Sequence, residues 1–510
     1  MFTEARHERA FALHVLLRSC RTGRFVPGAG CGVLLNFSHM TKNTSKFAIA
    51  ILAAGKGTRL KSKYPKVLHE IAGKPLLGHV VAAAKQVVPA TQIFAIIGHE
   101  ADRVRQTMQN TGIEFVEQKE QRGTGHAIMQ TRDALKDFED VLVLSGDVPL
   151  IRKETIERLL YFHRETGAAM TILTTEPSDP FGYGRVFRKQ SGGRNTDEVE
   201  RIVEQKLLSG DQQGNREINS GIYAFRVKPL FAHLDEITTD NPHGEYYLTD
   251  IVAILAKAGE KVVALRADDS HEVLGVNTRG ELAVLDAHLR TKKCQELMAD
   301  GVSIFKPETC VIDFDVVVGP DTTIEPFVQL LGETKIGSEC RIRSYSVVSN
   351  STLGNGVLLR HGSIVDQSKV ADGALLGPYC HLRPGSDIGE SAHVGNFVET
   401  KKTRLGKGSK ANHLTYLGDS EIGAGVNVGA GTITCNYDGV NKFGTVIGDN
   451  VFVGSDATLV APIEIGKGAY IGAGSCITEN VPEDALALGR GRQVNKEGWA
   501  KRKREERKKK

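Results

Sequence analysis

Three cations follow a predicted strand in LAAGKGTRLKSKYPK, which runs from Leu52 to Lys66. The apolar run before it, which begins at Phe47, is typical of a buried parallel strand. Two alanines and two glycines then form a turn whose backbone N–H groups can approach a flat or negatively charged ligand. With Lys56 and Arg59 also close by, this turn predicts a site for a nucleoside triphosphate. It lacks the GxxxxGK[ST] pattern of a P-loop, and GKGTRL does not fit GxGxxG. An ordinary strand-to-helix turn with surface cations is the alternative.

A carboxylate, Asp147, follows a second short apolar run at 141–144. Ligands of parallel α/β sheets bind beyond the carboxyl ends of the strands, and both this run and the cationic turn end there. Mg²⁺ takes oxygen ligands and bridges phosphates, so Asp147 is a candidate metal ligand. A turn-forming aspartate before Pro149 is the alternative. Nearby EQKEQRGTGHA could supply hydrogen bonds to a base or sugar through Gln118, Gln121, Gly123 and Thr124.

A second set of reactive residues comprises Arg383, Lys401, His413 and Tyr416. Arginine and lysine suit a sugar phosphate. His413 can remove a proton near neutral pH, as the attack of an amino group on a thioester requires, because an ammonium is not a nucleophile. A histidine among surface turns is the alternative. The nearby Cys435 is interpreted as a small buried residue rather than a nucleophile.

The elements that position the first set alternate between strand and helix from Phe47 to about Asn277. Gln92–Gly98 is a strand candidate, and Leu76–Val88 and Lys153–Glu165 are helix candidates. This alternation predicts a mostly parallel α/β sheet. Glu281–Asp300 has helical spacing of leucines and is expected to form a connecting helix.

Beyond that helix an aliphatic residue recurs every six positions, often followed by glycine. This hexapeptide repeat is the signature of a parallel β-helix, and a chance all-β sandwich is the alternative. The register slips near Thr400–Ala411 and Asn436–Phe443, where loops are expected. The repeating positions are Val318, Ile324, Leu330, Ile336, Ile342, Val348, Val370, Leu376, Leu382, Ile388, Val394, Ile447, Val453, Leu459, Ile465, Ile471 and Ile477.

Composition limits the remaining possibilities. The net charge of +4 divides into +3 for residues 1–39, +6 for 496–510 and therefore −5 for the body, so it does not indicate a nucleic-acid partner. No apolar run approaches the roughly 20 residues of a membrane span. The eight scattered cysteines fit reduced thiols in a cytoplasmic protein. The only tryptophan, Trp499, is expected to anchor a short C-terminal segment, and the basic end is interpreted as a solvated tail.

Ordered motifs resemble one family over Phe47 to about Gly498. LAAGKGTRL and PKVL are typical of sugar-1-phosphate nucleotidylyltransferases, and the whole pattern resembles the bacterial bifunctional N-acetylglucosamine-1-phosphate uridylyltransferases/glucosamine-1-phosphate acetyltransferases. The other motifs are EQ–GTGHA, GDVPL, GYGR, VEQK, EINSGI, GEYYLTDI, GVN, RPG, VGNFVE, KANHLTYLGD, GAGTITCNYDG, VFVGSD and KEGW.

The resemblance implies a Rossmann-like nucleotidyltransferase domain followed by a left-handed parallel β-helix of hexapeptide repeats. We expect a uridylyltransferase domain at 40–278, a linker helix at 279–301, a β-helix acetyltransferase domain at 302–482 and a C-terminal segment at 483–510. Residues 1–39 are expected to be a disordered extension, with Met40 as the alternative start.

For the first domain the resemblance implies uridylyl transfer from UTP to N-acetylglucosamine 1-phosphate with Mg²⁺. Arg59 and Lys66 would neutralise the phosphates, and Asp147 and Asn277 would ligate the metal. Ser145 departs from members that carry tyrosine there. The nucleotide and sugar would contact Leu52, Ala53, Ala54, Gly55, Lys66, Gln118, Gly123, Thr124, Gly184, Glu204, Asn219 and Asn277.

For the β-helix the resemblance implies acetyl transfer from acetyl-CoA, with His413 as general base and a homotrimer that shares the site between chains. No nucleic-acid or membrane partner is expected. Glucosamine 1-phosphate would contact Arg383, Lys401, Tyr416 and Asn427. Acetyl-CoA would contact Ala430, Asn436, Tyr437, Ser455, Ala473 and Arg490.

The expected product is UDP-N-acetylglucosamine, an activated sugar for cell-wall and envelope polysaccharides. The acetyl transfer would come first and supply the substrate of the uridylyl transfer. Two other hypotheses are a plain sugar nucleotidylyltransferase with an inert β-helix and a non-enzymatic scaffold that retained the fold.

Overall fold

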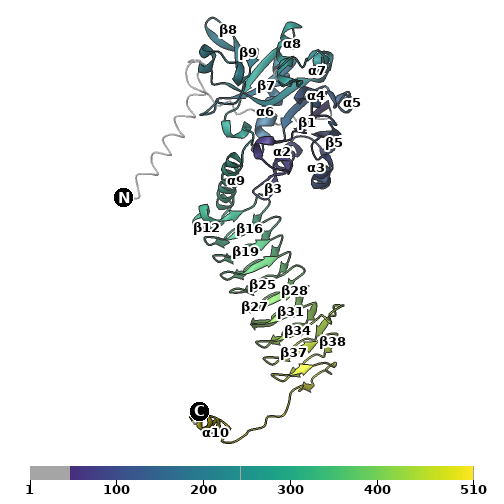
Figure 1. Ribbon diagram of the computed structural model, residues 1–510, viewed down its shortest axis with the longest axis vertical. Helices are drawn as coiled ribbons and strands as arrows, with labels where there is room; N and C mark the ends of the chain where they lie inside the picture. Colours follow the sequence, from purple (N-terminus) through teal and green to yellow (C-terminus); the bar gives the residue numbers. More distant parts are fainter. Residues whose placement is uncertain (1–45, 242, 509–510) are drawn as a thin grey trace, which may run out of the picture. The chain divides into compact units, whose positions relative to one another are not determined.

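The structure is a computed structural model that describes residues 46–241 and 243–508. It contains a nine-stranded sheet with its helices, a long helix, and a stack of short parallel strands (Figure 1). The expectations for residues 1–39 lie outside the described residues. Both predicted architectures, the α/β sheet and the parallel β-helix, are present.

The nine-stranded sheet is mostly parallel, as predicted. Its centre is β1, whose neighbours β4 and β6 both run parallel to it, and in the whole sheet β9 and β10 run opposite to the other seven strands. In order across the sheet the strands are β5 (Glu114–Glu117), β4 (Ile93–Ile97), β1 (Phe47–Ala53), β6 (Asp140–Ser145), β10 (Ile218–Arg226), β7 (Met170–Thr175), β11 (Val262–Arg266), β9 (Arg194–Val203) and β8 (Arg185–Ser191).

Helices cover both faces of this sheet, because its central strands are apolar on both sides. One buried core contains residues of α2, α3 and α6, and another contains residues of α4, α5, α7 and α8. The helix predicted to reach Val88 ends at Lys85, just before VVP, where Pro89 disfavours helix at the residue before it. These helices are α2 (Leu76–Lys85), α3 (Ala101–Met108), α4 (Thr124–Met129), α5 (Arg132–Leu135), α6 (Lys153–Thr166), α7 (Val227–His233) and α8 (Ile251–Lys257).

The predicted connecting helix is α9 (Arg279–Ala299). Thr278 and Glu281 form a capping box that fixes its first turn. Arg290 on this helix donates to Asp286 and to the buried Asp313, which lies in the first coils of the β-helix. One guanidinium therefore holds two carboxylates at the start of the stack.

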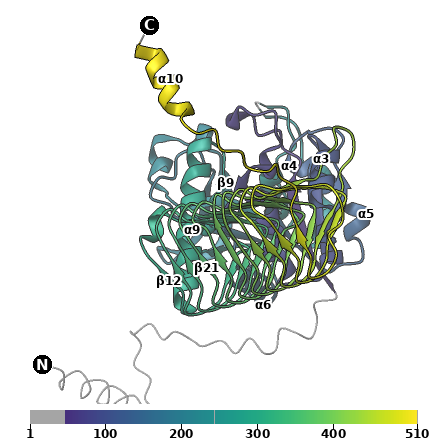
Figure 2. The same ribbon diagram turned by 90° about the horizontal axis from the view of Figure 1, so that it is seen from below.

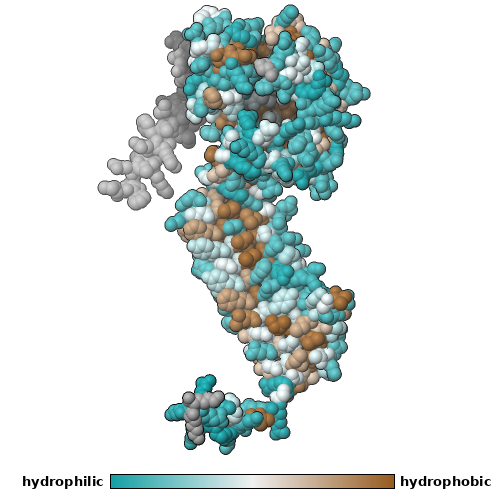
Figure 3. Space-filling model, in the orientation of Figure 1, coloured by the Kyte–Doolittle hydropathy of each residue, from teal (hydrophilic) through white to brown (hydrophobic). Residues whose placement is uncertain are grey.

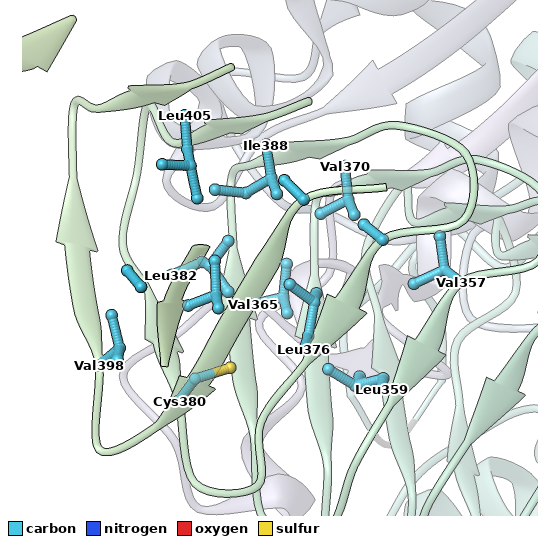
Figure 4. Packing of buried hydrophobic residues seen from close by; sticks show 14 of the residues in the cluster. Val357, Leu359, Val365, Val370, Leu376, Cys380, Leu382, Ile388, Val398 and Leu405 are labelled. Carbon is cyan, nitrogen blue, oxygen red and sulfur yellow. The ribbon is translucent and has the colours of Figure 1, made fainter. Parts of the chain in front are cut away.

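The stack is a parallel β-helix of three sheets with 11, 10 and 9 strands, from β12 (Ser303–Ile304) to β41 (Leu486–Ala487). Figure 2 shows its coils one behind another. The aliphatic residues at every predicted repeat position are buried, with exposed fractions of 6% or less. Figure 4 shows such side chains, among them Val365, Leu376 and Leu382, gathered inside the coils.

One of the two predicted loops is present and the other is wrong. Near Thr400–Ala411 the coil is one residue shorter, since Asp387 pairs with Arg404, 17 residues on, whereas Leu375 pairs with His393, 18 residues on. At the second slip, residues 436–444 do form a loop, between β34 (Ile433–Cys435) and β35 (Thr445–Ile447). Register alone did not distinguish a shortened coil from an inserted loop.

The C-terminal segment also differs from its prediction. Trp499 begins α10 (Trp499–Lys508) and is 53% exposed, so it does not anchor the segment to a core. Among the described residues no helix is long and apolar enough to cross a membrane. The cysteines of the same part of the chain carry free thiols.

The Leu382→Ala variant tests the aliphatic column of the β-helix. Leu382 is fully buried, so the substitution leaves a cavity and is expected to lower the free energy of unfolding by about 2–5 kcal/mol. The measurement is urea unfolding followed by circular dichroism. The matched control is Leu486→Ala, because Leu486 is 65% exposed. Equal losses in both variants would contradict a column that carries the stability of the stack.

Candidate active sites

A cleft of about 490 Å³ opens at the carboxyl ends of β1 and β6, as the sheet topology requires. β1 and β6 are paired so that Leu52 lies opposite Ser145, which brings their two following turns together. The residues predicted from the cationic turn and from Asp147 therefore line one cavity. Its lining includes Leu52, Ala53, Ala54, Gly55, Lys56, Lys66, Gln118, Gln121, Gly123, Thr124, Ser145 and Asp147.

The two predicted metal ligands meet on one ammonium group. Nζ of Lys66 forms an ion pair with Asp147 and donates to Oδ1 of Asn277 at 3.0 Å. Arg59 donates to the same Asn277 oxygen at 2.7 Å. A carboxylate and an amide oxygen therefore converge where a cation already lies, and this donor set fits a hard divalent ion completed by phosphate oxygens. No group of three or more His, Cys, Asp or Glu in the described residues could hold a metal by itself.

Two residues that sequence reasoning did not place at this site support its ligands. The hydroxyl of Ser145 donates to Oδ1 of Asp147 at 2.6 Å. The carboxylate of Glu281 accepts the backbone N–H of Asn277 at 2.5 Å. Glu281 and Asp147 also face Tyr183, whose pKa is raised by burial and then by these two carboxylates. The capping pattern of Thr278 and Glu281 was the available signal for the second contact.

Gln118 organises the loop that forms the other wall of the cleft. It is buried, and its Nε2 donates to the Gly123 carbonyl and lies 3.0 Å from Nδ1 of His126. Gly123 has a φ of +108°, and a Cβ there would lie 2.5 Å from the carbonyl oxygen of Tyr246. Only glycine therefore fits this close approach. Thr124 accepts the backbone N–H of Leu248 through its hydroxyl.

Three predicted sugar contacts also lie together. The backbone N–H of Asn219 donates to the Gly184 carbonyl at 2.9 Å. A Cβ on Gly184 would lie 3.4 Å from the carboxylate of Glu204. The pKa of Glu204 is raised by burial and then by the carboxylate of Asp250. These residues form a polar corner beside the strands β8 and β10.

In the β-helix, one cluster gathers on the 10-stranded sheet. Arg383 forms an ion pair with Glu399 at 2.8 Å, and Glu399 is paired in register with Tyr416. The contact with Glu399 raises the pKa of Arg383. Lys401 lies on the same strand as Glu399, β28 (Glu399–Lys401). The three predicted sugar-phosphate residues of this sheet are therefore neighbours.

The loop at 436–444 adds to this cluster. Asn436 donates to Asp419 at 2.5 Å, and both the Asn436 amide and the Tyr416 hydroxyl lie over Gly418. Lys442 from the same loop contacts Lys401, which lowers the pKa of Lys442. The sequence analysis did not select Lys442, although it stands just after the quoted GAGTITCNYDG motif. Two lysines side by side are a good counter-charge for a phosphate.

His413 ends strand β30 (Lys410–His413) and belongs to a ridge at a corner of the coils. Backbone hydrogen bonds link the successive coils along this ridge, from Leu414 to Asn396, from Gly431 to Leu414, from Asp456 to Ala430 and from Gly474 to Ser455. Arg490 donates to the Ala473 carbonyl at 2.7 Å. The predicted acetyl-CoA residues Ala430, Ser455 and Ala473 therefore continue the ridge that holds His413.

The two groups stand on different sheets of the same chain. Asn427 pairs with Lys410 on the 11-stranded sheet that also contains β30, whereas Lys401 and Tyr416 lie on the 10-stranded sheet. Within the described chain, no hydrogen bond or ion pair joins His413 to Lys401 or Arg383. The chain thus carries a base and a phosphate cluster on separate surfaces.

Family models match both parts of the chain. A MobA-like NTP transferase domain matches residues 49–214, and the bacterial transferase hexapeptide model, with six repeats, matches residues 315–350 and 444–479. These matches agree with the cleft of the nine-stranded sheet and with the coils of the β-helix.

Relatives match nearly the whole chain. The chain is 81% identical to the bifunctional protein GlmU of Koribacter versatilis over 92% of its length and 100% of that protein. It is 52% identical to the GlmU of Solibacter usitatus, with 89% and 97% covered, and 46% identical to that of Streptococcus agalactiae, with 90% and 98% covered. With a nucleotidyltransferase domain and hexapeptide transferase repeats in one polypeptide, the chain belongs to the GlmU family of bifunctional enzymes.

Proposed function

We propose that the sheet-edge cleft and the His413 ridge are the two active sites of UDP-N-acetylglucosamine synthesis. The enzyme acetylates glucosamine 1-phosphate and then transfers a uridylyl group from UTP to the acetylated sugar. The observation that carries the assignment is the convergence of Asp147 and Asn277 on the Lys66 ammonium. It supports a uridylyltransferase domain at residues 40–278 and an acetyltransferase domain at 302–482.

In the uridylyl step, a phosphate oxygen of N-acetylglucosamine 1-phosphate attacks the α-phosphorus of UTP in line. A P–O bond forms, and the bond to pyrophosphate breaks. Arg59 and Lys66 neutralise the phosphates, which is the main contribution that a protein can make to such a transfer. Asp147 and Asn277 hold Mg²⁺, which supplies charge neutralisation when it is bound.

The remaining cleft residues bind the two substrates. Leu52 and the turn Ala53–Gly55 face the uracil together with Gln118 and Gly123, whose loop is held in place by internal hydrogen bonds. The N-acetyl sugar is held by the polar corner of Thr124, Gly184, Glu204 and Asn219.

In the acetyl step, His413 accepts a proton from the amino group of glucosamine 1-phosphate. The nitrogen lone pair attacks the thioester carbonyl, the C–N bond forms, the C–S bond breaks, and the thiolate of CoA leaves and is protonated. Arg383, Lys401 and Tyr416 bind the sugar phosphate, with Asn427 on the adjacent sheet. Acetyl-CoA lies along the ridge and is contacted by Ala430, Asn436, Tyr437, Ser455, Ala473 and Arg490.

A homotrimer would complete this site. The corner next to the ridge carries a ladder of exposed apolar residues, Phe327, Tyr345, Tyr379, Phe397 and Leu414, with exposed fractions of 47–65%. All five have positive φ, a strained conformation for bulky residues. Figure 3 shows apolar side chains along the β-helix. Contact with a second chain would cover the ladder and bring a phosphate cluster to His413. The free thiols support a cytoplasmic location.

A complementary pair of variants tests the two assignments. With glucosamine 1-phosphate, acetyl-CoA, UTP and Mg²⁺, the wild type is expected to form UDP-N-acetylglucosamine. His413→Ala should lose about 100-fold or more in this assay, because it lacks the base, and should recover when N-acetylglucosamine 1-phosphate is supplied. Product analysis by chromatography checks both results. Full acetyl transfer by His413→Ala would contradict the assignment of the base.

Asp147→Asn tests the metal site. It keeps the size of the side chain and removes the charge, so binding of Mn²⁺, measured by electron paramagnetic resonance in the presence of UTP, is expected to weaken about tenfold or more. The same variant should accumulate N-acetylglucosamine 1-phosphate in the coupled assay. Unchanged Mn²⁺ binding would contradict a metal role. Asp133→Asn, on the first turn of α5, is the matched control.

The trimer is tested by replacing Tyr379 and Phe397 with serine. Analytical ultracentrifugation is expected to give three chain masses for the wild type and a smaller species for the variant. Acetyl transfer should fall with trimer content while uridylyl transfer persists. The control is Val317→Ser, since Val317 is 56% exposed on a different sheet from that of β30. A wild-type monomer with full acetyl transfer would contradict the shared site.

A further inference from the structure

The side chain of His413 has one hydrogen-bond partner in the described chain, Asn396, which lies one coil earlier. Nδ1 of His413 is 2.9 Å from Oδ1 of Asn396. The two residues are also paired directly in the parallel register of β27 (His393–Asn396) and β30. The contact therefore follows from the coil-to-coil register and is repeated wherever this register forms.

The backbone around the pair is fixed on several sides. The N–H of Leu414 donates to the carbonyl of Asn396 at 3.1 Å, and the Thr415 hydroxyl donates to the carbonyl of His413 at 2.7 Å. A Cβ on Gly395 would lie 2.0 Å from the carbonyl oxygen of Asn412. Glycine at 395 thus allows the two strands to approach so closely that the next side chain, Asn396, reaches the imidazole.

An amide oxygen can only accept a hydrogen bond, so the contact requires a proton on Nδ1 of His413. The other ring nitrogen, Nε2, then carries the lone pair. Because the amide is neutral, it fixes the tautomer and the ring orientation without stabilising the imidazolium as a carboxylate would. A general base that must be neutral before each turnover benefits from such a partner.

We propose that Asn396 is a positioning residue for acetyl transfer, which holds His413 in the tautomer whose Nε2 removes the proton from the amino group. This inference rests on the proposed role of His413 as the base. The charged groups near the pair are His393 on β27, Lys410 on β30 and Arg360 from an earlier coil, and Lys410, Arg360 and His413 lower the pKa of His393 together with burial. The following coil presents Ala430 at this corner and adds no charge.

The test compares Asn396→Leu and Asn396→Asp in full-length protein. Asn396→Leu keeps the volume and removes the acceptor, so kcat for acetyl transfer is expected to fall about tenfold or more, with KM for glucosamine 1-phosphate changed less than about threefold. Asn396→Asp restores the acceptor and should recover most of kcat. Its carboxylate favours the imidazolium, so the acidic limb of the pH–rate profile should move to higher pH.

The matched control is Asn355→Leu, because Oδ1 of Asn355 also accepts a hydrogen bond of 2.9 Å from a residue 17 positions away, the N–H of Ser338. It should leave kcat unchanged. Uridylyl transfer, measured on each variant, reports whether the chain is folded. An unchanged kcat in Asn396→Leu, an effect confined to KM, or an Asn396→Asp profile that does not move would overturn the inference. Retained acetylation by His413→Ala would instead remove the proposed base itself.

Discussion

Parallel pairing between successive coils is the constraint on which the second half of the molecule depends. Each short strand donates and accepts hydrogen bonds with the coil before and the coil after, so a residue at one corner is repeated at the same corner 17 or 18 positions later. The buried aliphatic column and the exposed ridge are two results of this one register. Polar chemistry can be placed outside because the interior is uniformly apolar.

The nine-stranded sheet solves a different problem, which is to hold cations close together without ligand. Lys66 and Arg59 both approach Asn277, and Asp147 offsets part of their charge. Two cations against one carboxylate leave an excess of positive charge at the cleft. A phosphate group is attracted there, and the pre-formed contacts reduce the rearrangement that binding requires.

The amino-acid sequence predicted the family, both architectures and the contacts of Asp147 and Asn277, because strand periods and strand ends are local signals. It did not predict that the slip near Thr400 is a shortened coil, since both possibilities shift the period alike. Lys442 and Asn396 were missed for a related reason. Their partners are reached only through the fold, Lys442 across a loop and Asn396 across one coil, and neither has a sequence pattern of its own.

The ridge from His413 through Ala430 and Ser455 to Ala473 also sets a length. Neighbouring parallel strands are about 4.8 Å apart, so four successive coils span about 14 Å. A molecule that contacts all four must be extended, and its reactive end reaches His413 only if its other end lies near Ala473 and Arg490. The stacked coils thus act as a ruler, in which the number of coils rather than the shape of a pocket decides how long an acyl donor has to be.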